Sequence, residues 1–144
     1  MSAPSGLELL QGIVQGTYPA PPIQATLGFT LDEVQEGRAV FSAPVAEAHY
    51  NPMSTLHGGV AATLLDSAMG CAVHSTLPPG VAYTTLEFKV NFIRPATAAT
   101  GRIAAEGTLV HRGSRVATAE GRLVAVDDGR LLAHATATCL IIGA

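Results

Sequence analysis

The centre of the chain carries the clearest periodic pattern. Between residues 57 and about 75, small and apolar side chains recur three and four residues apart, the spacing of one face of an α-helix. Few positions in this segment are strongly polar, so most of the helix circumference is expected to be buried. The pattern predicts a long helix in the middle of the protein. Its apolar stripe consists of Val60, Ala61, Leu64, Leu65, Ala68, Cys71 and Ala72.

A period-two pattern follows the Pro78-Pro79-Gly80 break and continues towards the carboxyl end. In its first segment, apolar side chains alternate with Glu87, Lys89 and Asn91, as in an antiparallel strand with one buried face. That apolar face consists of Leu86, Phe88, Val90 and Phe92. Tight hairpins are expected at residues 112–114 and 127–129. The pattern predicts four long strands, near residues 84–93, 102–111, 115–126 and 131–142.

The chain before the helix predicts a short arm and one hairpin. Residues 7–14 have the spacing of an amphipathic helix, which the prolines between residues 19 and 22 prevent from continuing. Strands are expected near residues 24–31 and 39–44, joined by a turn at Glu36-Gly37. Together the elements predict an α+β fold, in which a curved antiparallel sheet of five to six strands wraps a long central helix. We therefore expect a helical arm in residues 1–22 and one domain in residues 23–144.

Composition limits the kind of core and the location. The 144 residues are 48% hydrophobic but only 5% aromatic, so small aliphatic side chains must build the interior and let a helix pack closely on a sheet. No apolar run reaches the roughly 18 residues of a membrane span, and the amino end lacks an export signal. We expect a cytoplasmic protein without a membrane partner, in which Cys71 and Cys139 are reduced core thiols.

Charge is unevenly distributed along the chain. The net charge of −3 argues against nucleic acid as a partner. Between Lys89 and Arg122, however, six basic residues are accompanied only by Glu106 and Glu120. Two interpretations stay open, namely a positive patch for an anionic ligand and solvated strand edges.

The start of the predicted helix is a candidate site for a developing negative charge. Gly58 and Gly59 are costly inside a helix, but in its first turn they let a ligand approach N–H groups that lack helical partners. Such donors stabilise the charge that a carbonyl oxygen acquires in a transition state. The N–H of Gly58 is the first candidate, with Gly59 beside it.

Asp66 is the second candidate group. It lies seven residues beyond Gly59, on much the same helical face but about 10 Å further along the axis. Burying a carboxylate without a partner is costly, which favours a functional role or a satisfied hydrogen-bond network. One helix cannot bring both groups to one carbonyl, so joint action requires a second copy, antiparallel across a two-fold axis.

Residues 51–66 are similar to the motif of PaaI-like thioesterases, which belong to the hotdog-fold superfamily together with 4-hydroxybenzoyl-CoA thioesterase. Asn51 lies six residues before His57, and Asp66 lies nine after it, as in that motif. The resemblance continues through the segment Asn91-Phe92-Ile93-Arg94-Pro95 and covers roughly residues 26–142. It implies the hotdog fold and hydrolysis of an acyl-CoA or aryl-acyl-CoA to a carboxylic acid and free coenzyme A.

The resemblance also implies roles for single residues. Asp66 is the nucleophile or the general base, two alternatives that the sequence leaves open. Gly58 is the oxyanion donor, Asn51 positions the substrate, and Thr85 orients the attacking water. Coenzyme A is part of the substrate, so no separate cofactor is implied. The expected assembly is a homodimer, which pairs into a dimer of dimers.

The remaining candidates surround this site. His57 is interpreted as a structural residue, with direct proton transfer as the alternative. Leu65 and Met69 are expected to line the acyl pocket. Cys71 and His74 are too few ligands for a metal ion, so none is expected.

A cationic turn is the candidate for coenzyme A phosphates, with an ordinary exposed hairpin as the alternative. It consists of Arg112, Gly113, Ser114 and Arg115.

Two other functions stay open at this point. Hotdog hydratases and dehydratases generally pair a catalytic His with an acid in different motifs. A non-catalytic acyl-CoA binding module would not need a carboxylate at Asp66.

Overall fold

The computed structural model describes residues 2–143 and contains three α-helices, six strands and two short 3-10 turns within them. The helices are α1 (Gly6–Gln15), α2 (Pro22–Leu27) and α3 (Gly58–His74). The strands are β1 (Thr30–Gln35), β2 (Arg38–Pro44), β3 (Ala82–Phe92), β4 (Arg102–Arg112), β5 (Val116–Ala125) and β6 (Leu131–Ile142). The 3-10 turns span Glu47–His49 and Ala98–Thr100.

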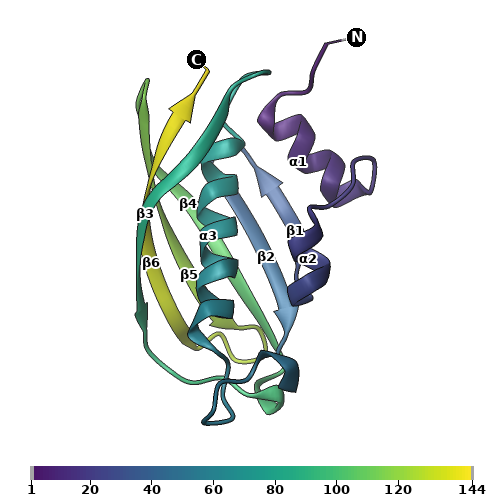
Figure 1. Ribbon diagram of the computed structural model, residues 1–144, viewed down its shortest axis with the longest axis vertical. Helices are drawn as coiled ribbons and strands as arrows, with labels where there is room; N and C mark the ends of the chain where they lie inside the picture. The colour runs from purple at the N-terminus through teal and green to yellow at the C-terminus, as the bar shows by residue number, and fades with distance from the viewer. Residues whose placement is uncertain (1, 144) are drawn as a thin grey trace.

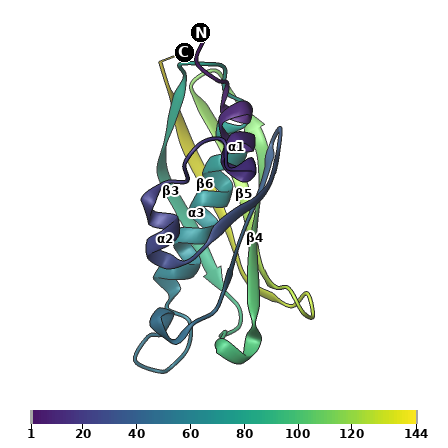
Figure 2. The ribbon, with the colours of Figure 1, turned by 90° about the vertical axis from the view of Figure 1, so that its right-hand side faces the viewer.

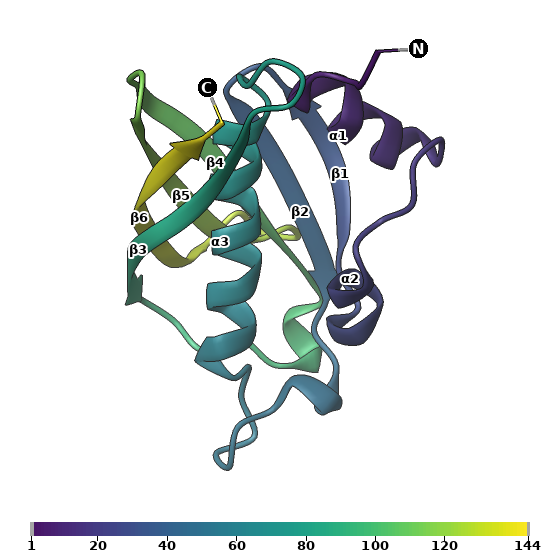
Figure 3. The ribbon, with the colours of Figure 1, turned by 45° about the horizontal axis from the view of Figure 1, so that its top comes forward.

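The six strands form one antiparallel sheet in the order β1-β2-β4-β5-β6-β3. The sheet curves around α3, which runs along its concave face (Figure 1; Figure 3). This architecture confirms the predicted α+β hotdog fold and all four long strands after the central helix. None of the helices in residues 2–143 is both long and apolar enough to cross a membrane.

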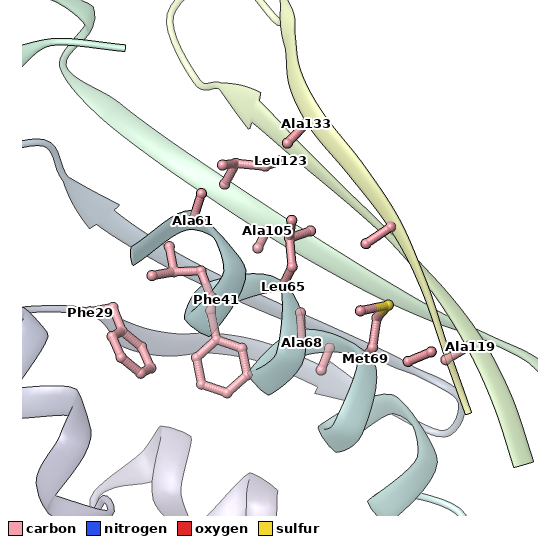
Figure 4. Packing of buried hydrophobic residues seen from close by; sticks show 14 of the residues in the cluster. Phe29, Phe41, Ala61, Leu65, Ala68, Met69, Ala105, Ala119, Leu123 and Ala133 are labelled. Atoms are coloured by element: carbon pink, nitrogen blue, oxygen red, sulfur yellow. The ribbon is translucent and has the colours of Figure 1, made fainter. Parts of the chain in front are cut away.

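Small side chains allow α3 to lie very close to the sheet. Ala68 of α3 and Ala105 of β4 are fully buried, and Ala119 of β5 is 1% exposed (Figure 4). A Cβ atom added to Gly107 of β4 would overlap the carbonyl oxygen of Ala68. The contact between helix and sheet is therefore backbone against backbone at this point, as the Ala-rich and aromatic-poor composition predicted.

The amino-terminal arm packs on the helix and the sheet (Figure 2). The expected helix in residues 7–14 is confirmed as α1, which begins with a capping box between Ser5 and Glu8. The N–H of Gly6 donates to the carbonyl of Leu77 at 2.9 Å, and Leu10 is buried in the core. The arm is thus tied to the end of α3.

The strand predicted in residues 24–31 is wrong in its first half. Pro22 begins α2, a position where proline is favourable because its missing N–H is not needed. Gly28 ends α2 in the left-handed conformation, at φ 74°. Strand β1 starts only at Thr30. The helix start at Pro22 and the helix end at Gly28 outweigh the short alternation of apolar and polar residues between them.

A β-bulge in β3 changes which side chains face α3. Thr85 pairs with Cys139 and Glu87 pairs with Thr138, so Leu86 is the extra residue. Before the bulge, the odd-numbered Thr85 faces α3; after it, the even-numbered Phe92 does, where it contacts Gly58. Leu86 is therefore not on the face that Phe88, Val90 and Phe92 share. The predicted burial of that face is wrong for the single chain, in which Phe88 is 38% and Phe92 58% exposed.

The contact between α3 and β4 predicts a strong dependence of stability on Gly107. Gly107→Ala is expected to lower the free energy of unfolding by about 2–3 kcal/mol. Its Cβ would overlap the backbone of Ala68, which can move only together with α3. Gly121→Ala is the matched control, since its Cβ would lie 3.1 Å from the flexible ends of Leu65 and Met69. Urea denaturation at one protein concentration measures both, and equal midpoints would contradict this account.

Candidate active site

The first turn of α3 presents one unpaired backbone N–H. His57 is the N-cap, and its ring Nδ1 accepts a hydrogen bond from the N–H of Gly59 at 2.8 Å. Within residues 2–143, the N–H of Gly58 has no acceptor. His57 therefore has a visible structural role as a cap, and it leaves Gly58 as the free donor at this end of the helix.

Gly58 lines a surface depression of about 380 Å³. Asn51, Phe92 and Arg94 line the same depression. A Cβ atom at position 58 would lie 3.1 Å from Cζ of Phe92, so glycine keeps this approach to the helix end open. The motif in residues 91–95 gave no position for these side chains, and the structure places Phe92 and Arg94 beside Gly58 in this depression.

Asn51 organises the loop that leads to α3. Its side-chain oxygen accepts from the N–H groups of Met53 at 2.9 Å and Thr55 at 3.2 Å. Its Nδ2 donates to Oγ1 of Thr55 at 2.9 Å. The loop therefore holds Asn51 at the rim of the depression, and a direct contact with substrate stays a prediction.

Asp66 lies half-buried on the side of α3 that faces β3, the edge strand of the sheet. Oγ1 of Thr85 donates to its Oδ1 at 3.0 Å. Within residues 2–143 this is the carboxylate's one hydrogen bond, so Oδ2 is left without a partner. Thr85 faces Asp66 just before the bulge in β3, so the structure brings together the two residues that the sequence placed on separate elements.

The free N–H and the carboxylate do not meet within one protomer. Gly58 and Asp66 are eight residues apart on one continuous helix, which separates them by about 12 Å along its axis. This geometry agrees with the expectation that a shared carbonyl needs two copies of the chain.

Leu65 and Met69 are core residues in the single chain, and their predicted lining of the acyl pocket stays a prediction. Both are fully buried on the sheet side of α3, where they would contact a Cβ added to Gly121. Asp66 is only half-buried and faces β3, so Leu65 and Met69 pack in the core where Asp66 does not. The helical periodicity identified them as apolar but could not tell a core position from a pocket position.

The cationic turn lies at the opposite end of the sheet from the Gly58 loop (Figure 1). It joins β4 to β5, and the N–H of Gly113 donates to the carbonyl of Val116 at 2.8 Å. The Nε of Arg112 is buried and has no acceptor within residues 2–143. The turn is a hairpin, as predicted, and Ser114 and Arg115 are exposed on it.

The two cysteines are thiols, and one of them lies close to Asp66. Burial, and then the charge of Asp66, raise the pKa of the Cys71 thiol to about 12, so it stays protonated at neutral pH and is a poor nucleophile. Cys71 and Cys139 are free thiols. Residues 2–143 contain no group of three or more His, Cys, Asp or Glu side chains arranged to hold a metal ion.

Known proteins share this arrangement. Residues 53–132, more than half of the chain, match the sequence model of the thioesterase superfamily. The 1,4-dihydroxy-2-naphthoyl-CoA hydrolase of Listeria monocytogenes is 29% identical over 91 residues, which cover 63% of this chain and 72% of the hydrolase.

Solved structures agree over nearly the whole chain. A thioesterase family protein from Silicibacter pomeroyi is 33% identical, with a TM-score of 0.83 over 94% of this chain and 99% of that protein. A variant of the phenylacetic acid degradation protein PaaI from Thermus thermophilus is 29% identical, with a TM-score of 0.75 over 83% of this chain and 98% of that protein. These matches confirm the resemblance stated from residues 51–66. The chain therefore belongs to the thioesterase superfamily, and it is a thioester hydrolase with the hotdog fold.

Proposed function

We propose that the protein hydrolyses acyl-CoA thioesters in two equivalent sites at the interface of a homodimer. The observation that carries this proposal is the layout of α3, which has one unpaired N–H at Gly58 and a carboxylate with one free oxygen at Asp66. The name of the Listeria relative supports a coenzyme A thioester as the substrate.

The edge of the sheet at β3 supports the dimer. β3 is a terminal strand of the sheet, so its outer N–H and C=O groups have no strand partner within residues 2–143. Large apolar side chains are exposed on it, with Leu86 at 57%, Phe92 at 58% and Phe88 at 38%. Two β3 edges that pair antiparallel about a two-fold axis would cover these side chains.

This pairing would also bring the two α3 helices together. In Figures 1 and 3, β3 lies beside α3, so the second copy of α3 would follow the second copy of β3 across the axis. The two helices then run antiparallel, and Gly58 of one copy approaches Asp66 of the other. Each dimer contains two such sites. Association of two dimers into a tetramer stays a prediction.

The two groups have complementary roles in thioester hydrolysis. The N–H of Gly58 stabilises the charge on the carbonyl oxygen as the carbon becomes tetrahedral. Asp66 acts at the carbonyl carbon, either directly or by taking a proton from water, and both routes use the oxygen that Thr85 leaves free. Water is consumed, the C–S bond breaks, and the thiol of coenzyme A and a carboxylic acid are released.

The Arg112–Arg115 turn is proposed to bind phosphates of coenzyme A. The unpaired Nε of Arg112 and the exposed Arg115 supply charge-assisted donors for phosphate oxygens.

Replacing Gly58 by proline tests the backbone donor. Gly58 is the first residue of α3, where proline is tolerated, and the extended ψ of 131° at His57 suits a residue before proline. Gly58→Pro is expected to lower kcat about 100- to 1000-fold with little loss of stability, because it removes the N–H. Gly58→Ala is the control, since it adds the same Cβ near Phe92 and keeps the N–H. Equal kcat values in the two variants would remove Gly58 N–H from the mechanism.

Thr85 tests the positioning of the carboxylate. Thr85→Val keeps the shape but loses the hydroxyl that donates to Asp66, so kcat is expected to fall at least about tenfold while KM changes little. Thr85→Ser keeps the hydroxyl and should stay within about threefold of wild type. A Val variant as active as the Ser variant would show that this hydrogen bond is not used.

Mixing two inactive variants tests the shared site. Asp66→Asn is expected to lower turnover at least about a hundredfold. Refolding it together with Gly58→Pro forms mixed dimers in which one site carries both changes and the other carries neither. Thiol release should then recover to about a quarter of the wild-type rate, because half of the dimers are mixed and one site in each is intact. A mixture as inactive as its components would refute the interface site.

A further inference from the structure

His49 lies at the base of the loop that leads to α3. This loop closes on itself like a small hairpin. The N–H of His57 donates to the carbonyl of His49 at 2.8 Å, and further out the N–H of Asn51 donates to the carbonyl of Thr55 at 2.8 Å. His49 is therefore the backbone partner of His57, the residue immediately before Gly58.

The imidazole of His49 is hydrogen-bonded at both of its nitrogens. Nδ1 accepts from the N–H of Ala46 at 3.1 Å, and Nε2 lies 2.7 Å from the carbonyl oxygen of Leu27. A backbone N–H can only donate and a carbonyl can only accept, so Nδ1 carries no proton and Nε2 carries one. The neutral ring in this tautomer satisfies both partners, and the two bonds fix the backbone of His49.

The bond to Leu27 connects α2 to this loop. Leu27 is the last residue of α2, and carbonyls in the last turn of a helix lack a partner within the helix. The Nε2–H of His49 supplies the missing donor. A chain of hydrogen bonds therefore leads from α2 through the ring and the backbone of His49 to the N–H of His57.

His57 is anchored on both sides of its Cα atom. Its carbonyl accepts from the N–H groups of Val60 at 3.0 Å and Ala61 at 3.4 Å, which belong to α3. Its N–H is held by the carbonyl of His49. The peptide group between His57 and Gly58 is planar, so a rotation of this group would turn the Gly58 N–H together with the His57 carbonyl. The two anchors oppose that rotation, and hydrogen bonds weaken steeply when the donor is misaligned.

We propose that His49 is a positioning residue, which holds the peptide group between His57 and Gly58 so that the Gly58 N–H points at the carbonyl oxygen of the substrate. The inference rests on the proposed thioester hydrolysis. His49 acts through the backbone and does not contact the substrate. The Gly58 N–H is used most strongly in the transition state, so kcat depends on His49 and KM does not.

Replacing the His49 ring tests this role. His49→Ala removes both ring bonds and is expected to lower kcat at least about tenfold, while KM stays within about twofold of wild type. His134→Gln, at an exposed histidine of β6, is the control and should keep the wild-type kcat. Circular dichroism checks that each variant is folded. A His49→Ala protein with the kcat of wild type would overturn the proposal.

Two amide variants keep one ring bond each. His49→Asn keeps an acceptor near the place of Nδ1, and His49→Gln keeps a donor near the place of Nε2. Each should lower kcat at least about threefold, but less than His49→Ala does. If His49→Ala does not fold, these variants decide, and wild-type kcat values in both would contradict the role of the ring.

A double-mutant cycle with Gly58→Pro distinguishes positioning from a general loss of structure. In the Gly58→Pro background no N–H is left to orient, so adding His49→Ala should lower kcat less than about twofold. A further tenfold loss in that background would show that His49 acts on another group, and the proposal would then be wrong.

Hydrogen exchange separates this inference from the proposed function. If the wild-type protein cleaves no thioester, acyl-CoA hydrolysis fails, and amide exchange followed by NMR decides on His49. The N–H of His57 should exchange at least about tenfold faster in His49→Ala than in wild type, because its acceptor is no longer fixed. The N–H of Leu109, bonded to the carbonyl of Gly37, should exchange at the same rate in both proteins. Equal exchange of the His57 N–H would refute the anchoring by His49.

Discussion

The backbone of α3 touches the sheet at Ala68 and Gly107, where a glycine in β4 leaves no atom between the two chains. This contact fixes the distance and the rotation of the helix. One side of α3 is thereby committed to the core, through residues such as Leu65 and Met69. Asp66 lies on a neighbouring side of the helix, half-buried against the edge strand β3. The core and the proposed site therefore use two sides of one helix. The packing of the core fixes the positions of the site residues.

A helix fixed in this way can hold reactive groups without motion. Its first turn carries the unpaired N–H of Gly58, because the N-cap His57 takes the neighbouring N–H of Gly59. Two turns further on, Thr85 holds one oxygen of Asp66 and leaves the other free. Both groups are therefore oriented before any substrate arrives, which is the condition under which electrostatic stabilisation of a transition state is strongest.

The parts of the molecule that complete the site come from outside this helix. The exposed apolar edge at β3 is where the proposed second copy would pair. An uncovered strand edge with exposed apolar side chains is unfavourable in the isolated chain and marks a place where a partner fits.

The sequence by itself determined the central helix, the four long strands after it and the thioesterase motif between Asn51 and Asp66, because these depend on local periodicity and on spacing along the chain. Only the tertiary structure decided that residues 22–27 are helical, that Leu65 and Met69 belong to the core, and that a bulge at Leu86 puts Thr85 and Phe92 on the same side of β3. Period-two alternation cannot reveal a bulge, since one extra residue reverses the facing of all those that follow. Which apolar face meets the sheet, and which side chains from distant elements border one cavity, depend on packing between segments that the chain order does not specify.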